Sequence, residues 1–173
     1  MNNCHLIKYI GIDPGVGGGI AMIDEEGEIQ AYKCPKSSND MALLFQILMG
    51  NTPTNKIRLV MERVWARPAN AVRAAFSYGV NYGQWLGICA THEVEMNTTL
   101  PAKWIHWVGC PKALKKDVRK RWLKQRASDL YPSIKRVTLA TSDAILITHY
   151  AREQYFNEKE DTKILKAKQI KEN

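Results

Sequence analysis

The pattern of apolar and polar positions predicts that the chain begins with three strands. Residues 5–13, 18–24 and 28–35 are rich in apolar and β-branched side chains, and the turn EEGE separates the last two. Because the connections are short, we expect an antiparallel meander. A fourth strand is predicted over residues 56–64, KIRLVMERV, where a continuous apolar run is typical of a strand covered by helices on both faces.

The rest of the chain is predicted to be mainly helical. Helices are expected over residues 38–49, 68–91, 101–108, 112–130 and 142–155, and a fifth strand over residues 93–100. Ser38 is the expected cap of the first helix, which ends at Gly50. Three antiparallel strands followed by alternating helices and strands predict an α/β fold, with a five-stranded mixed sheet flanked by helices on both faces.

A row of small residues marks the helix expected over residues 68–91. Its members lie four positions apart and are Ala75, Gly79, Gly83 and Gly87. A glycine in a helix interior costs about 1 kcal/mol relative to alanine, so three on one stripe need a reason. Close approach of another backbone would supply it. The protein's own sheet and a second copy in a homodimer both fit this pattern.

Length and composition indicate a single globular domain. Dividing 173 residues into two domains would leave each half marginally stable, and 45% hydrophobic with 24% charged residues argues against bulk disorder. We expect residues 1–157 to form the domain and residues 158–173 to form a charged C-terminal tail. The net charge of +8 favours polyanionic partners without identifying one.

Cysteine usage and the distribution of apolar residues favour a cytoplasmic protein. The cysteines are widely spaced and form no metal-binding pattern, so we expect reduced thiols in a cytosol-like compartment. The N-terminal residues lack the apolar stretch of a signal peptide, and no segment approaches the ~20 apolar residues of a membrane span. We therefore expect a soluble protein with no membrane partner.

Three acidic residues lie at the ends of predicted elements that such a sheet could bring together. Asp13 ends the first strand, Glu62 lies near the end of the fourth, and Asp143 lies near the start of the last helix. Each also has an ordinary interpretation: a turn residue, an ion-pair partner of Arg63 or Arg67, and a helix N-terminal residue. Clustered carboxylates repel one another, and two Mg²⁺ or Mn²⁺ ions would remove that cost.

The glycine-rich stretch after Asp13, GIDPGVGGG, has a second interpretation. It could be a phosphate-binding loop of the actin and sugar-kinase class. That class needs a longer chain with two related domains, so the length of this chain argues against it.

Five separated stretches together resemble a known family. They read IGIDPGVGGGIAMID, LVMERVWARP, AAFSYGVNYGQWLGI, PAKWIHWVG and TSDAILITHYARE, and they span roughly residues 7–153. In order and approximate spacing they are similar to the RuvC-type Holliday-junction resolvases, above all to the phage and plastid branch. The resemblance implies an RNase H-like fold and a homodimer. It also implies a Mg²⁺- or Mn²⁺-dependent crossover junction endodeoxyribonuclease that makes paired nicks in four-way or branched DNA. The location implied is the cytoplasm of a bacterial or phage-infected cell, or an organelle nucleoid.

The resemblance also implies roles for particular residues. Asp13, Glu62 and Asp143 match three of the four metal-binding acids of the family, with Asp13 bridging the two ions. Lys115 matches the catalytic lysine of the family by its distance from Val118.

The fourth metal-binding position departs from the family pattern. The family has an acid or a histidine where this chain has Leu139 or Ala140. Three explanations stay open. Water, Thr141 or Ser142 could complete the site, an acid could reach it from elsewhere, or the protein could be a junction-binding dimer with weak or lost cleavage. A ribosomal-RNA-processing relative of the same fold is a further alternative.

A basic segment is the main candidate for DNA contact. Residues 112–126, KALKKDVRKRWLKQR, surround most of a predicted helix with positive charge and leave Val118, Trp122 and Leu114 as the expected buried stripe. A solvated surface is the ordinary interpretation of such a run. We expect phosphate contacts instead, from Lys112, Lys115, Lys116, Arg119 and Lys120.

Four further residues outside this segment are expected to meet DNA. Trp65 stands where the family has an aromatic residue that stacks at the opened centre of the junction, although a tryptophan of the core fits the local pattern too. Arg67 and Arg73 are expected to contact phosphates nearby. Lys103 is the nearest substitute for a second family lysine, whose position holds Ile105 here.

Overall fold

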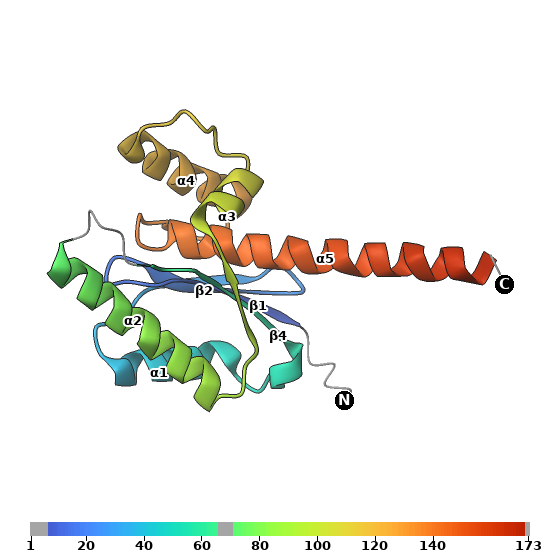
Figure 1. The fold of residues 1–173 in the computed structure, drawn as a ribbon, viewed down its shortest axis with the longest axis horizontal. Helices are drawn as coiled ribbons and strands as arrows, with labels where there is room; N and C mark the ends of the chain where they lie inside the picture. Colours follow the sequence, from blue (N-terminus) through green and yellow to red (C-terminus); the bar gives the residue numbers. More distant parts are fainter. Residues whose placement is uncertain (1–6, 66–70, 172–173) are drawn as a thin grey trace.

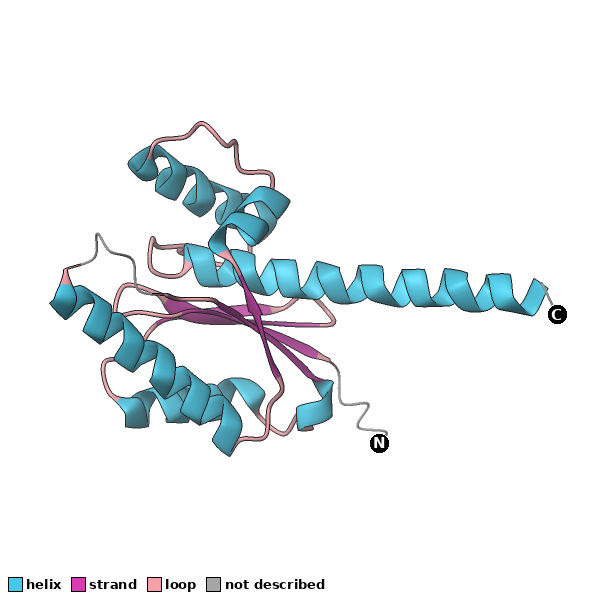
Figure 2. Ribbon diagram, in the orientation of Figure 1, coloured by secondary structure: helices cyan, strands magenta, loops and turns pink. Residues whose placement is uncertain are grey.

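The protein is built on a five-stranded mixed sheet. The computed structural model describes residues 7–65 and 71–171, and in the last helix it describes side chains through residue 155 and at residue 157. The strands are β1 (Lys8–Asp13), β2 (Gly19–Asp24), β3 (Ile29–Lys33), β4 (Ile57–Glu62) and β5 (Met96–Thr99). Their order is β3-β2-β1-β4-β5, and Figure 2 shows the strands in magenta with helices on either side. The first three strands pair antiparallel and β4 runs parallel to both neighbours, so the predicted meander and mixed sheet are confirmed.

Helices cover both faces of the sheet. α1 (Ser38–Met49) and α2 (Val72–Thr91) lie on one face, while α5 (Ser142–Lys171) lies on the other and carries α3 (Pro101–Trp107) and α4 (Lys116–Leu130) (Figure 1). A 3₁₀ turn at Thr54–Lys56 precedes β4. The two faces bury separate apolar clusters, centred on Phe45 and Trp85 under α1 and α2, and on Trp104 and Ile145 under α3 to α5. The predicted fold class is confirmed.

The starts of three helices differ from the prediction. α2 begins at Val72 with Ala71 as its N-cap residue, and residues 68–70 of the predicted helix lie outside the described residues. Ser37, not Ser38, caps α1, because its side chain accepts a hydrogen bond from the Asp40 backbone N–H at 3.1 Å. α4 begins at Lys116, so Lys112 precedes the helix and Lys115, with an extended backbone, is its N-cap residue. Asp117 in the first turn complements the positive end of the helix dipole and favours this start.

The buried stripe of α4 also differs from the prediction. Val118 is 41% exposed, whereas Leu123 and Ala127 are fully buried. These two residues lie four positions apart and join the apolar cluster beneath α5, with Trp122 and Leu114 only partly buried beside them. α4 therefore packs against α5 through its second half, and its first turn is exposed to solvent.

α5 is longer than predicted. It continues past Tyr155 to Lys171, and its second half extends beyond the sheet (Figure 1). The sequence after Tyr155 contains neither glycine nor proline, so no residue interrupts the helix. The division into a domain over residues 1–157 and a tail over residues 158–173 stays a prediction.

The glycine row of α2 faces outward. A Cβ atom added at Gly79, Gly83 or Gly87 would meet no described atom within 4 Å, so packing of this row against the protein's own sheet is wrong. The helix instead buries its opposite face, through Asn81, Trp85 and Cys89. Around the glycines lie exposed apolar side chains: Val72, Phe76, Val80 and Leu86. We call these seven residues the α2 outer face.

The cysteines are unpaired within the described residues. Cys34, Cys89 and Cys110 are buried free thiols, and Cys4 lies outside the described residues. No helix in the described part of the chain has the length and apolar character needed to cross a bilayer.

Candidate active site

Two of the three acidic residues end neighbouring strands, and the third begins a helix that crosses them. Asp13 is the last residue of β1 and Glu62 is the last residue of β4, and these strands are parallel neighbours with Ile12 opposite Met61. Parallel neighbours end at the same edge of a sheet. Asp143 lies in the first turn of α5, which packs across β1, β2 and β4. The chain therefore brings the three predicted acids to one edge.

Burial and nearby charges act on the carboxyl groups of Asp13 and Asp143. Burial, followed by the negative charges of Asp143 and then Glu62, raises the pKa of Asp13 well above its ordinary value of 3.8, and Lys120 opposes this shift. Burial also raises the pKa of Asp143. A hydrogen bond from Ser142 and the charges of Lys120 and Arg119 oppose that change. Asp13 is thus an acid whose ionised form is costly unless a cation compensates it.

The chemistry of these donors suits a hard divalent cation. Among the described residues, no three His, Cys, Asp or Glu side chains lie close enough together to hold one ion. Mg²⁺ usually binds one or two carboxylates and fills its other positions with water or phosphate oxygens, so it does not require three at once. Asp13 is the acid on which the negative charges of both Asp143 and Glu62 act.

Ala140, one of the two positions where the resemblance predicts a further ligand, lies close to the strand residue that pairs with Asp13. The Ala140 carbonyl oxygen is 2.6 Å from where a Cβ atom of Gly19 would stand, and Gly19 pairs with Asp13 in the sheet. Only glycine, which has no Cβ atom, permits this approach. Leu139 is 53% exposed, and neither it nor Ala140 offers a metal-binding side chain.

The two neighbouring hydroxyl groups already have local partners. The Thr141 hydroxyl lies 3.1 Å from that of Thr138 and also accepts a hydrogen bond from the Thr138 backbone N–H at 3.0 Å. The Ser142 hydroxyl donates to Asp143 Oδ1 at 3.1 Å. These bonds hold the turn before α5 and orient the Asp143 carboxylate.

Two residues of α2 that the sequence did not single out hold the loop after Asp13. Asn81 is buried, and its Oδ1 accepts a hydrogen bond from the Gly15 backbone N–H at 2.6 Å. The Tyr78 ring packs where a Cβ atom of Gly15 would be, 2.9 Å away, and Gly15 has a φ of 125°, which favours glycine. Burial, then Asp13, Glu62 and Asp143, raise the pKa of Tyr78 to about 12, so the phenol remains a donor. Helical spacing in the sequence shows which face of α2 Asn81 and Tyr78 occupy. It does not show that this face packs against the loop after Asp13.

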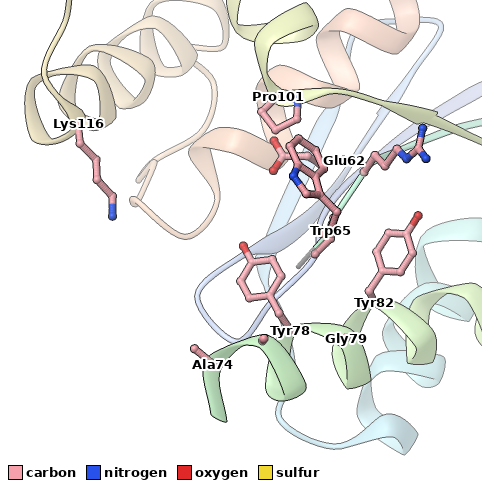
Figure 3. A pocket seen from close by; sticks show the side chains of 11 residues that line it. Glu62, Trp65, Ala74, Tyr78, Gly79, Tyr82, Pro101 and Lys116 are labelled. Carbon is pink, nitrogen blue, oxygen red and sulfur yellow. The ribbon is translucent and has the colours of Figure 1, made fainter. Parts of the chain in front are cut away.

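A cleft of about 500 Å³ opens beside Glu62. Trp65, Tyr78 and Tyr82 lie around it, with Lys116 on its far side (Figure 3). Trp65 is 45% exposed, so its interpretation as a core residue is wrong. The cleft thus combines aromatic surfaces and a lysine next to one of the acids, a combination suited to nucleotide bases and phosphates.

The basic residues before and within α4 differ in their relation to the acids. Lys120 and Arg119 are the α4 residues whose charges act on Asp143, and Lys120 also acts on Asp13. Lys116 lines the cleft. Lys112 and Lys115 are exposed residues that precede the helix.

The other predicted DNA-contacting residues are not among those that line the cleft, or lie outside the described chain. Lys103 lines a separate pocket of about 230 Å³ together with Thr99 and Tyr150. Arg73 is exposed on the first turn of α2. Arg67 lies outside the described residues.

Two solved structures from Thermus thermophilus resemble this chain. One is RuvC in complex with a Holliday junction substrate, which matches with a TM-score of 0.54 and 13% sequence identity over 86% of this chain and 96% of that chain. The chain shares the RuvC fold. The second is a Thermus thermophilus RuvC structure, with a TM-score of 0.50, 14% identity and the same coverage. No protein-family model and no curated protein sequence matches the chain. The RNase H-like architecture implied by the motifs is therefore confirmed at the level of the RuvC fold.

Proposed function

We propose that the protein is a structure-selective endonuclease that resolves Holliday junctions or related branched DNA. The observation that carries the proposal is the meeting of Asp13, Glu62 and Asp143 at one edge of a sheet with the RuvC fold. One of the similar structures is RuvC with a Holliday junction substrate, which supports the choice of substrate. The five sequence motifs support placement in the phage and plastid branch, acting in the cytoplasm or in an organelle nucleoid.

The chain's residues would divide the work of phosphodiester hydrolysis. Asp13, Glu62 and Asp143 would hold Mg²⁺ or Mn²⁺, which when bound activates water and stabilises the charge of the reacting phosphate. Lys120 and Arg119 contribute positive charge at the same place, and Lys115 remains the catalytic lysine proposed from the motif.

DNA contacts are proposed on the side of the molecule that carries the cleft. Trp65 and Tyr78 offer aromatic surfaces for unpaired bases, and Lys116 offers a charge for the backbone. Stacking on such a side chain contributes about 1–3 kcal/mol per base.

We further propose a homodimer that forms through the α2 outer face. This surface is apolar and exposed, and its glycines permit close approach of a second helix. Two active sites suit the near two-fold symmetry of a four-way junction, which needs matched nicks on two strands.

A second candidate function is junction binding with weak or lost cleavage. The observation that favours it is the absence of an acidic side chain at Leu139 and Ala140. Because the basic residues and the cleft do not depend on that position, binding would survive the loss of cleavage.

A synthetic four-way junction with each strand labelled in turn separates these functions. We expect binding in a gel-shift assay and paired nicks when Mg²⁺ or Mn²⁺ is added, with no nicks in a linear duplex of the same sequence. Asp13→Asn should bind and not cut. Tight binding by the wild type without nicks over hours would favour the second candidate. Displacement of the junction by an equal concentration of structured RNA would contradict both.

A further inference from the structure

A tryptophan indole contacts one of the proposed metal ligands. The Trp104 Nε1–H donates a hydrogen bond to Glu62 Oε2 at 2.7 Å. A distance this short is typical of a bond to an ionised acceptor. Glu62 ends β4, whereas Trp104 lies in α3, so the bond joins two elements that are far apart in the sequence.

The indole is held rigidly where it meets the carboxylate. Trp104 is 1% exposed and belongs to the apolar cluster under α5, together with Val108 and Leu123. Its helix follows β5 directly, and β5 is bound to the end of β4, where the Arg63 backbone N–H donates to the Thr99 carbonyl at 2.8 Å. The sheet and the core together fix the position of the donor.

We propose that Trp104 is a positioning residue for Glu62, fixing the plane of its carboxylate for metal binding. This inference rests on the proposed function. Each carboxylate oxygen can accept more than one bond, so the indole does not prevent Glu62 from binding an ion as well.

The chemistry of indole suits this task better than that of a cationic side chain. A lysine or arginine beside Glu62 would neutralise its charge and repel a divalent cation. The indole N–H donates a hydrogen bond, carries no charge and cannot accept a proton from the acid. It therefore orients Glu62 without competing for the ion. Partners that orient metal ligands in this way typically contribute 10- to 100-fold in metal affinity or activity.

The sharpest test compares two tryptophan variants. Trp104→Phe keeps most of the ring and removes the N–H donor. Trp107→Phe is the matched control, because Trp107 lies in the same helix, is partly exposed, and makes edge contacts with His149 and Tyr150. Mn²⁺ affinity without DNA is measured by calorimetry, and the Mn²⁺ dependence of junction cleavage is measured in parallel.

For Trp104→Phe we expect Mn²⁺ affinity to fall roughly 10- to 100-fold, and raised Mn²⁺ to restore most of the cleavage rate. Trp107→Phe should match the wild type in both. An affinity of Trp104→Phe within twofold of the wild type would overturn the inference while leaving the proposed function intact. A wild type that neither binds Mn²⁺ nor cuts junctions would overturn the proposed function, and this inference with it.

A second measurement does not depend on how well Trp104→Phe folds. The indole N–H signals of ¹⁵N-labelled protein are recorded by NMR, with Glu62→Gln for comparison. We expect one indole signal to move with Glu62→Gln and the same signal to move when Mg²⁺ is added to the wild type. If no indole signal responds to Glu62→Gln, the Trp104 bond does not exist in solution and the inference is wrong.

Discussion

At the scale of single residues, the acidic edge is a place where the chain accepts an electrostatic cost. Asp13 is surrounded by protein and lies near two other acids, and these effects raise its pKa. Without a bound cation, the folded protein would be more stable if Asp13 carried no charge. The surrounding bonds nevertheless hold the acids in place, from Trp104 to Glu62 and from Ser142 to Asp143. Such an arrangement is typical of a site built for a ligand that supplies positive charge.

The stability of the metal-free protein should therefore fall as the pH rises. Because the folded pKa of Asp13 is raised, the folded state binds its proton more tightly than the unfolded state above pH 3.8. The free energy of unfolding then decreases with pH until Asp13 is ionised in the folded state as well. In EDTA, Asp13→Asn should flatten this dependence and be more stable than the wild type at pH 7. Urea unfolding across pH 4–8 measures it.

Divalent metal should make the wild type more stable than Asp13→Asn, the reverse of their order in EDTA. Mn²⁺ at about 100 times its Kd would stabilise the wild type by about 2.7 kcal/mol and should leave Asp13→Asn nearly unchanged. Asp129→Asn, at an exposed aspartate of α4, serves as a control and should follow the wild type. If Asp13→Asn is the less stable protein in EDTA at pH 7, the charge of Asp13 is not a burden on the fold.

At the scale of elements, the site forms where two strands end and a helix begins. β1 and β4 end side by side, and α5 starts beside them. Basic residues of α4 supply positive charge to Asp143. α2 closes the cleft with Tyr78 and anchors the loop after Asp13 through Asn81. Each element contributes a side chain, and only the tertiary fold brings these side chains together into one site.

The first turn of α4 is predicted to contact a DNA phosphate through Lys116. Lys116→Ala should weaken junction binding and reduce the slope of log K against log salt concentration by about 0.9. Lys36→Ala, in the exposed loop before α1, is the control and should leave the slope unchanged. Fluorescence anisotropy at several salt concentrations measures both. An unchanged slope for Lys116→Ala would place the DNA elsewhere.

The sequence predicts the elements of this fold better than their contacts. Periodicity and turn residues recover the order of strands and helices, and the motifs locate Asp13, Glu62 and Asp143. The bond from Trp104 to Glu62 is not predictable in this way, because it joins residues that only the tertiary fold brings together. Val118 shows the same limit, since apolar spacing alone does not reveal which part of α4 meets α5.

At the scale of the whole molecule, the α2 outer face is an exposed apolar surface with no described neighbour above its glycines. Val72 is 87% exposed and Phe76 is 74% exposed, which is unusual for large apolar side chains. Gly79, Gly83 and Gly87 lie among them with open space above each Cβ position in the described structure. A homodimer through this face would explain both the apolar side chains and the tolerated cost of the glycines.

Gly83→Arg should separate the dimer while leaving the subunit folded. A Cβ atom at this position would meet no described atom of another part of the subunit within 4 Å, whereas an arginine side chain there would block the approach of a second helix. Ser77→Arg adds the same charge at another exposed position of α2 and should remain dimeric. Sedimentation velocity distinguishes the two states. A dimeric Gly83→Arg protein would show that the subunits meet through another surface.

The most direct test of the whole account is cleavage of a supercoiled plasmid that extrudes a cruciform. A dimer with two metal-dependent active sites should cut both strands within one binding event and convert the plasmid to its linear form. This reaction should require Mg²⁺ or Mn²⁺ and should be absent with Asp13→Asn. A wild-type protein that binds the cruciform and leaves the plasmid supercoiled in the presence of either metal would contradict the account.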